Sequence, residues 1–391
     1  MKQRDTMVPV LRGGRGVIKA SLGAAAAGVI LLLIGIFVDP ARLAFAYLTA
    51  YVYLVSIAVS ALLFLMICHA MRASWPVVVR RLTEAIVKTM PLLLLLFIPL
   101  LFGLRTLYPW LRPHDMERLA HKAAYLNRGY FVARTALYFV IWIVVGHLLC
   151  RWSEASDREP ALPVAHRLYA FSGGAIPLVG LALTFASFDW IMSLSPSFYS
   201  TMFPVYVFAG GCLGAIAALT LSTAVADRRG LLPGVNTSHY YALGRLLLTF
   251  TVFWAYSAFF QLLLHWEANR PDEVEFYKKR IEGPWQEVSA VLVIVKFAIP
   301  FLLLLNYRIK RVPGALAAAS VWLLAAHYID IHWLVIPELG RPGFPYSFLD
   351  LAAILAQGGA VVAFAVHRLR GLPLLPINDP RLPEALAYDS V

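Results

Sequence analysis

Several protonatable side chains of this chain lie within segments that are otherwise apolar. The clearest case is the run His327-Tyr328-Ile329-Asp330, inside an apolar stretch from about residue 315 to about residue 336. Residues three apart in an α-helix share a face, so His327 and Asp330 could pass a proton between them. His332 lies about 140° away round the same helix, so the run is a poor three-ligand metal site.

Ionisable residues of the apolar segments fall into two groups by depth. One group lies towards the ends opposite the N-terminal side or near the middle: Asp189, Glu287, Lys296, His327, Asp330 and Asp350. The other lies towards the N-terminal side: Glu84, Lys88, His147 and Arg245. A charge inside a bilayer costs roughly 2.5–3.5 kcal/mol on insertion scales, and such residues often mark a proton path. We therefore predict two polar half-clusters of a proton pathway, and the sequence does not decide whether they connect.

Lys296 needs a carboxylate partner at its depth, and Asp330 or Asp189 is the expected partner. Two further sets of polar residues share helical faces: Asp350 with Gln357, and Ser257 with Gln261 and His265. His265 and His332, near the ends of their segments, are predicted to be interfacial. The alternative for the whole set is that its buried polar contacts only tie helices together.

Redox cofactors have few candidate ligands in this chain. Cys68, Cys150 and Cys212 form no C-x-x-C or C-x-x-C-H motif, so we expect no iron–sulfur cluster and no covalently attached haem. A b-type haem needs two facing histidines, and His69 with His147 is the depth-matched pair that leaves this alternative open. Any redox chemistry must otherwise use a partner's cofactor. We assign no metal site, no certain catalytic residue and no quinone-binding residue.

The elements that position these residues are apolar helices. The chain has 391 residues, 60% of them hydrophobic and 14% charged, with a mean hydropathy of +0.71. This composition predicts an all-α, polytopic integral membrane protein, because a spanning helix needs roughly 20 mostly apolar residues. The expected spans lie at about 17–38, 43–70, 84–107, 131–151, 168–193, 200–226, 240–266, 285–307, 314–336 and 347–367.

Lysine and arginine gather on the side of the N-terminus and of alternate loops, including Arg80, Arg81, Arg228, Arg229 and Arg368. By the positive-inside rule both termini are predicted to be cytoplasmic. The net charge of +12 then indicates topology and contact with membrane lipid, and we expect no nucleic-acid partner.

Two spans share a local pattern. Asp189 and Asp330 each precede a proline, Pro196 and Pro337, by seven residues at the same end of a span. Four spans separate them, so both run in the same direction. This pattern predicts a single membrane domain, 1–391, with two parallel four-helix bundles at 43–193 and 200–336 and peripheral helices at 17–38 and 347–370.

Two longer segments lie opposite the termini. Residues 108–130 carry Met116, Leu119, Ala123 and Leu126 at helical spacing, which predicts a short amphipathic helix at the interface. Residues 267–284 contain Pro271 and acidic residues positioned to open a helix, with Glu275 and Lys279 four apart. The second segment is either a solvated loop or a docking surface for a partner.

Several runs resemble a known family. They are "SFDWIMSLSPSFYSTMFPVYVFAG", "FWAYSAFFQLLLHWEANRPDEVEFYKKRIEGPWQEVS", "FAIPFLLLL", "AAHYIDIHWLVIPE", "YLNRGYFVARTALYF" and "RWSEASDREP". Together they look like the ActF-type membrane subunit of bacterial alternative complex III, in the NrfD or polysulfide-reductase membrane-subunit superfamily. The resemblance covers most of the chain, from the "LYPWLRP" loop to the ninth span.

The resemblance implies ten helices in the bacterial inner membrane and a set of partner subunits. These are a sister NrfD-like ten-helix subunit, an iron–sulfur subunit with a molybdopterin-enzyme-like domain, and multihaem and monohaem cytochromes c. Haem c and iron–sulfur clusters would belong to the partners, and menaquinol or ubiquinol would be the substrate of the complex. By motif, Asp189, His327 and Asp330 would lie on a second proton route. Members often carry a histidine before F-x-I-P-F, where this chain has Lys296.

The leading hypothesis is therefore a cofactor-free membrane subunit of a respiratory quinol:cytochrome c oxidoreductase, which supplies a proton-conducting half-channel and a docking surface and is not catalytic alone. Two alternatives stay open. The chain could be a purely structural scaffold of the same complex. It could also be an independent proton-coupled transporter, for which Gly210-Gly211 and Gly358-Gly359 are candidate interruptions of spanning helices.

Overall fold

The computed structural model describes residues 10–112, 119, 122–157, 161–341 and 345–390, and these contain ten helices long and apolar enough to cross a membrane. Apart from one isolated bridge between Val10 and Pro373, the regular structure of the described residues is helical. The predicted all-α, multi-pass membrane fold is confirmed.

The ten spans correspond to those expected from the sequence, with ends that differ by a few residues. They are α1 (Arg15–Val38), α2 (Pro40–Ala70), α3 with α4 (Arg80–Val87 and Met90–Leu107), α6 (Arg128–Ala155), α7 (Ala161–Trp190), α8 (Phe203–Arg228), α9 (Thr237–Ala268), α11 with α12 (Pro284–Val293 and Ile299–Leu305), α13 (Pro313–Val335) and α14 (Phe348–Leu369). Short helices α10 (Pro271–Ile281) and α15 (Leu382–Leu386) lie outside the spans.

Polar caps fix where several spans begin. The Asp39 side chain accepts the N–H of Arg42, and Pro40 occupies the first turn of α2, where its missing N–H leaves no bond unmade. Asn127 and Asn236 cap α6 and α9 in the same way. Ser347 and Asp350 form a reciprocal capping box at the start of α14.

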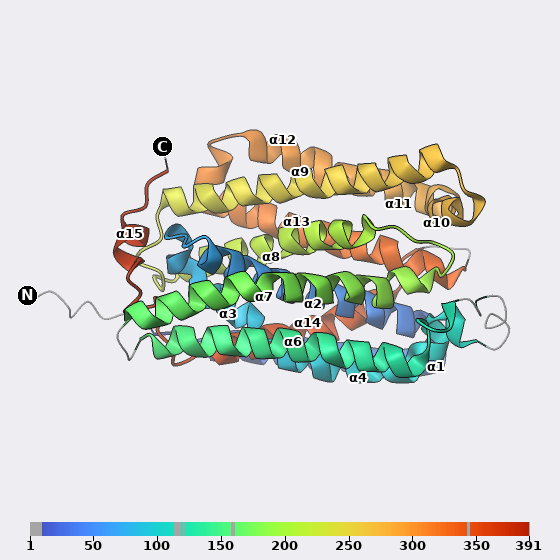
Figure 1. Cartoon of the computed structure of the whole chain (residues 1–391), viewed down its shortest axis with the longest axis horizontal. Coiled ribbons are helices and arrows are strands. Elements are labelled where there is room, and N and C mark those ends of the chain that lie inside the picture. The colour runs from blue at the N-terminus through green and yellow to red at the C-terminus, as the bar shows by residue number, and fades with distance from the viewer. Residues whose placement is uncertain (1–9, 113–118, 120–121, 158–160, 342–344, 391) are drawn as a thin grey trace, which may run out of the picture.

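The spans run side by side along the long axis, and the chain enters and leaves at the same end (Figure 1). Helix α2 lies at the centre, in contact with α4, α7, α8, α13 and α14, while α1 packs along α14. In the second half α8 contacts both α9 and α13, and α9 contacts α12. The division into two related bundles, 43–193 and 200–336, stays a prediction.

The span that contains Lys296 is interrupted by a π turn, Ile294–Ala298. The N–H of Ile299 bonds to the carbonyl of Ile294, five residues back. The Val295 carbonyl loses its α-helical donor and instead accepts the indole N–H of Trp322 at 2.6 Å. Pro300 follows and cannot donate to the Lys296 carbonyl. In a regular α-helix, two residues four apart differ in direction by roughly 40° round the helix axis. The extra residue of a π turn cancels this difference. Lys296 and Pro300, which are four apart, therefore both face inward.

Of the two longer segments expected opposite the termini, 267–284 contains the helix that the sequence predicts. Helix α10 begins at Pro271, and Lys279 lies 3.6 Å from Glu275, as predicted. Helix α10 packs against the end of α13, where the buried Arg280 pairs with Glu338 and donates to the carbonyls of Trp333 and Leu334. For the amphipathic helix expected within 108–130, Met116 lies outside the described residues, and the described residues 122–126 form turns.

Candidate proton-transfer site

The predicted pair of Lys296 and Asp330 is confirmed as a buried contact. Lys296 Nζ donates to Asp330 Oδ2, and both side chains are almost completely inaccessible to solvent. Lys296 Nζ also lies 3.3 Å from His327 Nδ1, and His327 Nδ1 lies 3.9 Å from Asp330 Oδ2. The shared face of His327 and Asp330 therefore meets a lysine from the preceding span.

Aromatic residues complete the surroundings of the ion pair. The hydroxyl of Tyr206 in α8 donates to Asp330 Oδ1, the carboxylate oxygen that Lys296 does not use. The ammonium of Lys296 lies 4.5 Å from the ring centre of Trp254 in α9, a cation–π distance. Both partners of the pair thus find further polar or π contacts, which a buried charge pair needs to offset its desolvation.

Ser56 determines which nitrogen of His327 carries the hydrogen when the ring is neutral. Ser56 Oγ donates to the carbonyl of Tyr53 and lies 3.0 Å from His327 Nε2. Since a hydroxyl has only one hydrogen, Nε2 must be the donor in that contact. The Nδ1 lone pair then faces Lys296, so the imidazole can accept a proton from the ammonium.

Glycines of α8 make room for these side chains. A Cβ on Gly210 would lie 3.4 Å from Lys296 Nζ and 3.3 Å from His327 Cε1. A Cβ on Gly214 would lie 2.8 Å from His327 Cδ2, which is closer than real contacts allow. Helix α8 is continuous through Gly210 and Gly211, so these residues permit close packing and do not interrupt the helix. Helix α14 is likewise continuous through its glycine pair.

A cleft of about 540 Å³ lies beside this cluster, between α9 and α11. The buried Tyr206 and Trp254 line it, together with exposed apolar residues such as Phe259 and Val293. Gln261 also lines the cleft; its amide donates to Tyr277, and its buried Oε1 has no hydrogen-bond partner. A polar group of this kind can bind a water or a ligand that enters the cleft.

His265 continues this polar face towards the end opposite the termini. Its Nδ1 donates to the Gln261 carbonyl at 2.6 Å, and its Nε2 lies 3.7 Å from Glu273 of α10. Ser257, Gln261 and His265 are all buried on one face, as predicted. The prediction that His265 is interfacial is wrong, because α10 folds over it.

Asp189 lies in a separate site. Arg134 of α6 grips its carboxylate with two bonds, of 2.8 Å and 2.9 Å, and the hydroxyl of Tyr138 donates to it at 2.8 Å. The structure does not bring Asp189 to Lys296, so of the two expected partners only Asp330 is correct. An arginine does not release its proton at any relevant pH, so this pair is a permanent ion pair that connects α6 to α7.

Asp350 lies in a third buried group at the same end. It accepts from Arg42 at 2.5 Å, bonds the Ser347 N–H of its own capping box, and lies 3.4 Å from His332 Nε2. His332 is buried, so its predicted interfacial position is wrong. Gln357 shares the helix but donates to the Tyr47 carbonyl. Glu287 is exposed and lies outside all three groups.

The cytoplasmic half-cluster expected from the sequence is divided. Glu84 pairs with Arg81, which also binds Asp157, and Lys88 pairs with Glu154. His147 and Arg245 are exposed, and Arg245 lies in α9, away from the Glu84 group.

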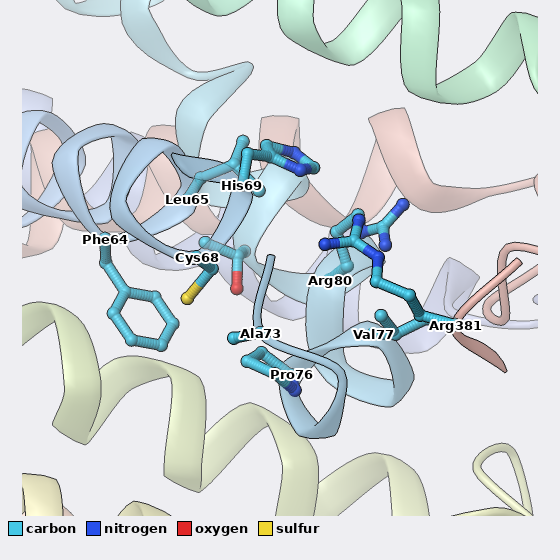
Figure 2. Close-up of a pocket in the computed structure, with 10 residues that line it drawn as sticks. Phe64, Leu65, Cys68, His69, Ala73, Pro76, Val77, Arg80 and Arg381 are labelled. Atoms are coloured by element: carbon cyan, nitrogen blue, oxygen red, sulfur yellow. The ribbon is translucent and has the colours of Figure 1, made fainter. Parts of the chain in front are cut away.

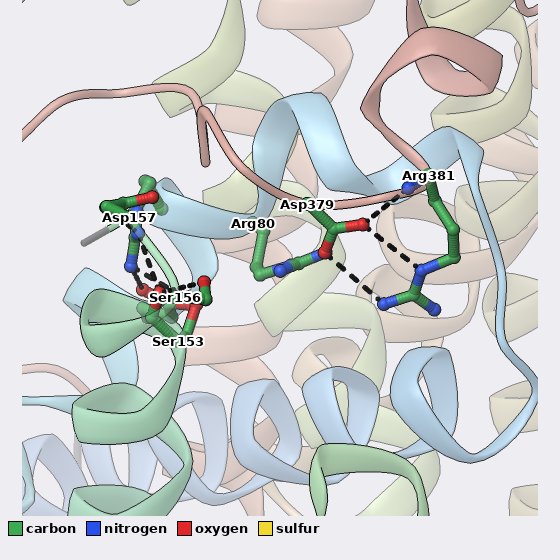
Figure 3. Close-up of polar contacts among 8 residues, drawn as sticks. Arg80, Ser153, Ser156, Asp157, Asp379 and Arg381 are labelled. Atoms are coloured by element: carbon green, nitrogen blue, oxygen red, sulfur yellow. Dashed lines mark hydrogen bonds and ion pairs between the residues drawn. The ribbon is translucent and has the colours of Figure 1, made fainter. Parts of the chain in front are cut away.

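The C-terminal segment adds a further ion-paired group at this end, where Asp379 lies between Arg80 and Arg381 (Figure 3). Burial raises the pKa of Asp379, but the two arginines outweigh this effect and hold its pKa below the usual value. These contacts fasten residues that follow the last span to the start of the third span.

The histidines considered for a haem are not brought together. His69 is buried beside Cys68, Arg80 and Arg381 at a cavity of about 10 Å³, which holds about one water molecule (Figure 2). His147 lines a different cavity between α4 and α6. The pair does not fit a b-type haem.

An apolar stretch of α2 lies between the Lys296 site and the end that holds the termini. Ser60 is the next polar residue of α2 after Ser56, and the eight residues that follow it, 61–68, are all apolar. Since a helix rises 1.5 Å per residue, about 13 Å of α2 lies between Ser60 and His69. The side chains of α2 do not join the two polar regions.

Tyr206, Arg134 and Arg42 were not predicted from the sequence as site residues. Each is an aromatic residue or an arginine near the end of a span, where such residues are common for other reasons. Arg134 carried a weak signal, because it precedes an apolar run within "GYFVARTALYF".

Comparison of the chain with protein-family models and with curated proteins finds no match. The resemblance to the ActF-type subunit therefore stays a prediction, supported by the runs quoted above.

Proposed function

We propose that this chain is a proton-transferring membrane subunit of a respiratory quinol:electron-acceptor oxidoreductase of the ActF type. The observation that carries the proposal is the buried group of Lys296, Asp330 and His327 on a π turn and its neighbouring helix. Lys296 lies within hydrogen-bonding reach of both Asp330 and His327, so one proton can be held at more than one of these groups. π turns occur frequently at functional sites.

The route to this group starts at the surface opposite the termini. Glu273 and His265 lie at the outer end, Gln261 and Tyr277 line the cleft, and Tyr206 bonds Asp330 at its inner end. The cleft provides the space between these side chains that water needs to connect them. The route is a half-channel, because the apolar stretch of α2 lies beyond His327 and Ser56.

In this role the chain supplies no redox cofactor, and quinol oxidation uses groups of its partner subunits. The outward face of α10, with the exposed Glu275 and Lys278, is the proposed docking surface. We place the protein in the bacterial inner membrane with both termini cytoplasmic.

The sharpest test removes the charge pair without leaving one charge unpaired. The double variant Lys296→Met/Asp330→Asn keeps the volume and an acceptor for Tyr206, so the fold should survive. We expect quinol-driven proton translocation by the purified complex in vesicles to fall at least about ten-fold while subunit content is unchanged. The matched control is Arg134→Gln/Asp189→Asn, which should retain translocation.

A scaffold is the second candidate, favoured by the bidentate Arg134–Asp189 contact and by the ion pairs of Arg81 and Arg80. If the Lys296 and Asp330 double variant assembles and translocates protons normally, the scaffold explains the chain and the proton route is wrong. If the chain purifies alone and colourless under conditions that preserve respiratory complexes, the transporter alternative takes precedence.

A further inference from the structure

A basic pocket lies at the end of the molecule that holds the termini, outside the proton-transfer site. It has a volume of about 630 Å³ and lies where the segment before α1, the junction of α3 and α4, and the ends of α6 and α14 meet. Its charged and basic lining residues are Arg12, Lys88, Glu154, His367, Arg368 and Arg370.

The positive charge of this pocket is largely uncompensated. The one carboxylate among its described lining residues is Glu154, which pairs with Lys88. Among the residues that the structure describes, Arg12, Arg368 and Arg370 form no ion pair with a carboxylate, and the buried Nε of Arg370 has no hydrogen-bond partner. A cluster of arginines without carboxylate partners can bind an anionic group that has several acceptor oxygens, such as a phosphate.

Two cavities adjoin the pocket, one with mixed apolar and charged walls and one that is mainly apolar. One, of about 140 Å³, runs between α4 and α6 past Met90, Pro91 and Ile143, and it shares Lys88, Glu154 and Arg368 with the basic pocket. It also adds Arg151 to the basic residues. The other, of about 440 Å³, lies among α1, α2, α8 and α14 and shares Leu11 with the basic pocket. Both extend from the basic end into the spanning part of the helices.

We propose that this surface binds an anionic phospholipid, with its phosphate among Arg12, Lys88, Arg368 and Arg370 and its acyl chains in the two adjoining cavities. The charge selects an acidic headgroup, and the apolar walls of the cavities select a lipid over a soluble phosphate. The position suits such a lipid, because basic pockets between spanning helices at this side of a membrane attract acidic headgroups. The bound lipid fastens α1 and α14 to α4 and α6.

The test uses the purified protein, with its partner subunits if they copurify, after lipid removal in mild detergent. Phosphatidylglycerol, phosphatidylcholine and inorganic phosphate are added separately, and the thermal unfolding midpoint is followed with concentration. We expect stabilisation by phosphatidylglycerol alone, weakened by added salt. In Arg368→Gln/Arg370→Gln its apparent affinity should fall roughly five-fold for each arginine removed.

Arg308→Gln is the matched control, since Arg308 is exposed at the same end of the molecule but lies outside the pocket. It should leave the lipid response unchanged. If the double variant fails to fold, Arg12→Gln, at an exposed arginine that lines the pocket, gives the same comparison. Equal stabilisation by phosphatidylcholine, equal stabilisation by inorganic phosphate, or an undiminished response in the arginine variants would each overturn the proposal.

Discussion

The sites of Asp189 and Asp330 are built from similar residue types, but only the Asp330 site has neighbours that can exchange a proton. Each aspartate lies seven residues before a proline, accepts a tyrosine hydroxyl, and takes a cation from the preceding span. Arg134 is 21% exposed and always charged, whereas Lys296 is 0% exposed and lies against His327. The first site fixes a charge at the edge of the molecule, and the second encloses groups that can exchange a proton.

The comparison shows that an acidic residue within a span does not by itself identify a proton path. A carboxylate held by an arginine with two bonds has a fixed partner of fixed charge. A carboxylate shared among a lysine, a histidine and a tyrosine has partners whose protonation can change. The identity of the cation therefore decides the role, and the cation comes from another span.

The largest effect is expected when one member of the enclosed pair is removed alone. Asp330→Asn leaves Lys296 as a buried charge without its carboxylate, which should cost about 3–5 kcal/mol of stability. Asp189→Asn should cost less, because Arg134 can reach solvent. The measurement is the unfolding midpoint of each variant in the same detergent. An equal loss in the two variants would remove the distinction between the sites.

A crowded glycine beside the enclosed site should give the next largest effect. Gly214→Ala places a Cβ 2.8 Å from His327, and the strain should cost about 1–3 kcal/mol and displace the imidazole. Gly173→Ala is the control, since a Cβ there meets no atom within 4 Å and alanine favours a helix. Thermal unfolding distinguishes them; a stabilised Gly214 variant would contradict the packing described.

Removal of the tyrosine hydroxyl from each site should show which of the two aspartates takes part in proton transfer. Tyr206→Phe removes one donor from Asp330 and should cost about 1 kcal/mol while it slows proton translocation. Tyr138→Phe removes the corresponding donor from Asp189 with a similar cost in stability and no change in translocation. Rates per assembled complex are the measurement. If both variants translocate protons at the normal rate, Tyr206 is not part of the route.

The smallest effect concerns a carboxylate outside the spans. The pKa of Asp379 is lower in the folded protein than its unfolded value of about 3.9. Its contribution to stability is therefore complete above that value and is lost as pH falls through the lower folded pKa. Compared with the wild type, Asp379→Asn should show a flatter loss of stability below about pH 4. Parallel pH profiles for the two proteins would count against the contact with Arg80.

The sequence was sufficient to predict much of the fold. Ten apolar segments and the helix that begins at Pro271 follow from length, composition and the preference of proline for the first turn of a helix, which act locally. The shared face of His327 and Asp330 also follows from helix geometry alone. Glu84, Lys88, His147 and Arg245 were grouped by depth, but depth does not fix the direction of a side chain. The structure accordingly leaves Arg245 on α9, away from Glu84, whereas Lys88 and His147 line one cavity.

Composition and helix periodicity are enough to show that charged residues lie within membrane-spanning helices and that His327 and Asp330 share a face. The packing of the helices is needed to show that Lys296 joins them, that Arg134 pairs with Asp189 in a separate site, and that His265 and His332 are buried. The reason is physical. A span's own residues fix its length and its faces, whereas the partner of a buried charge depends on which helices pack together and on how a π turn directs one lysine inward.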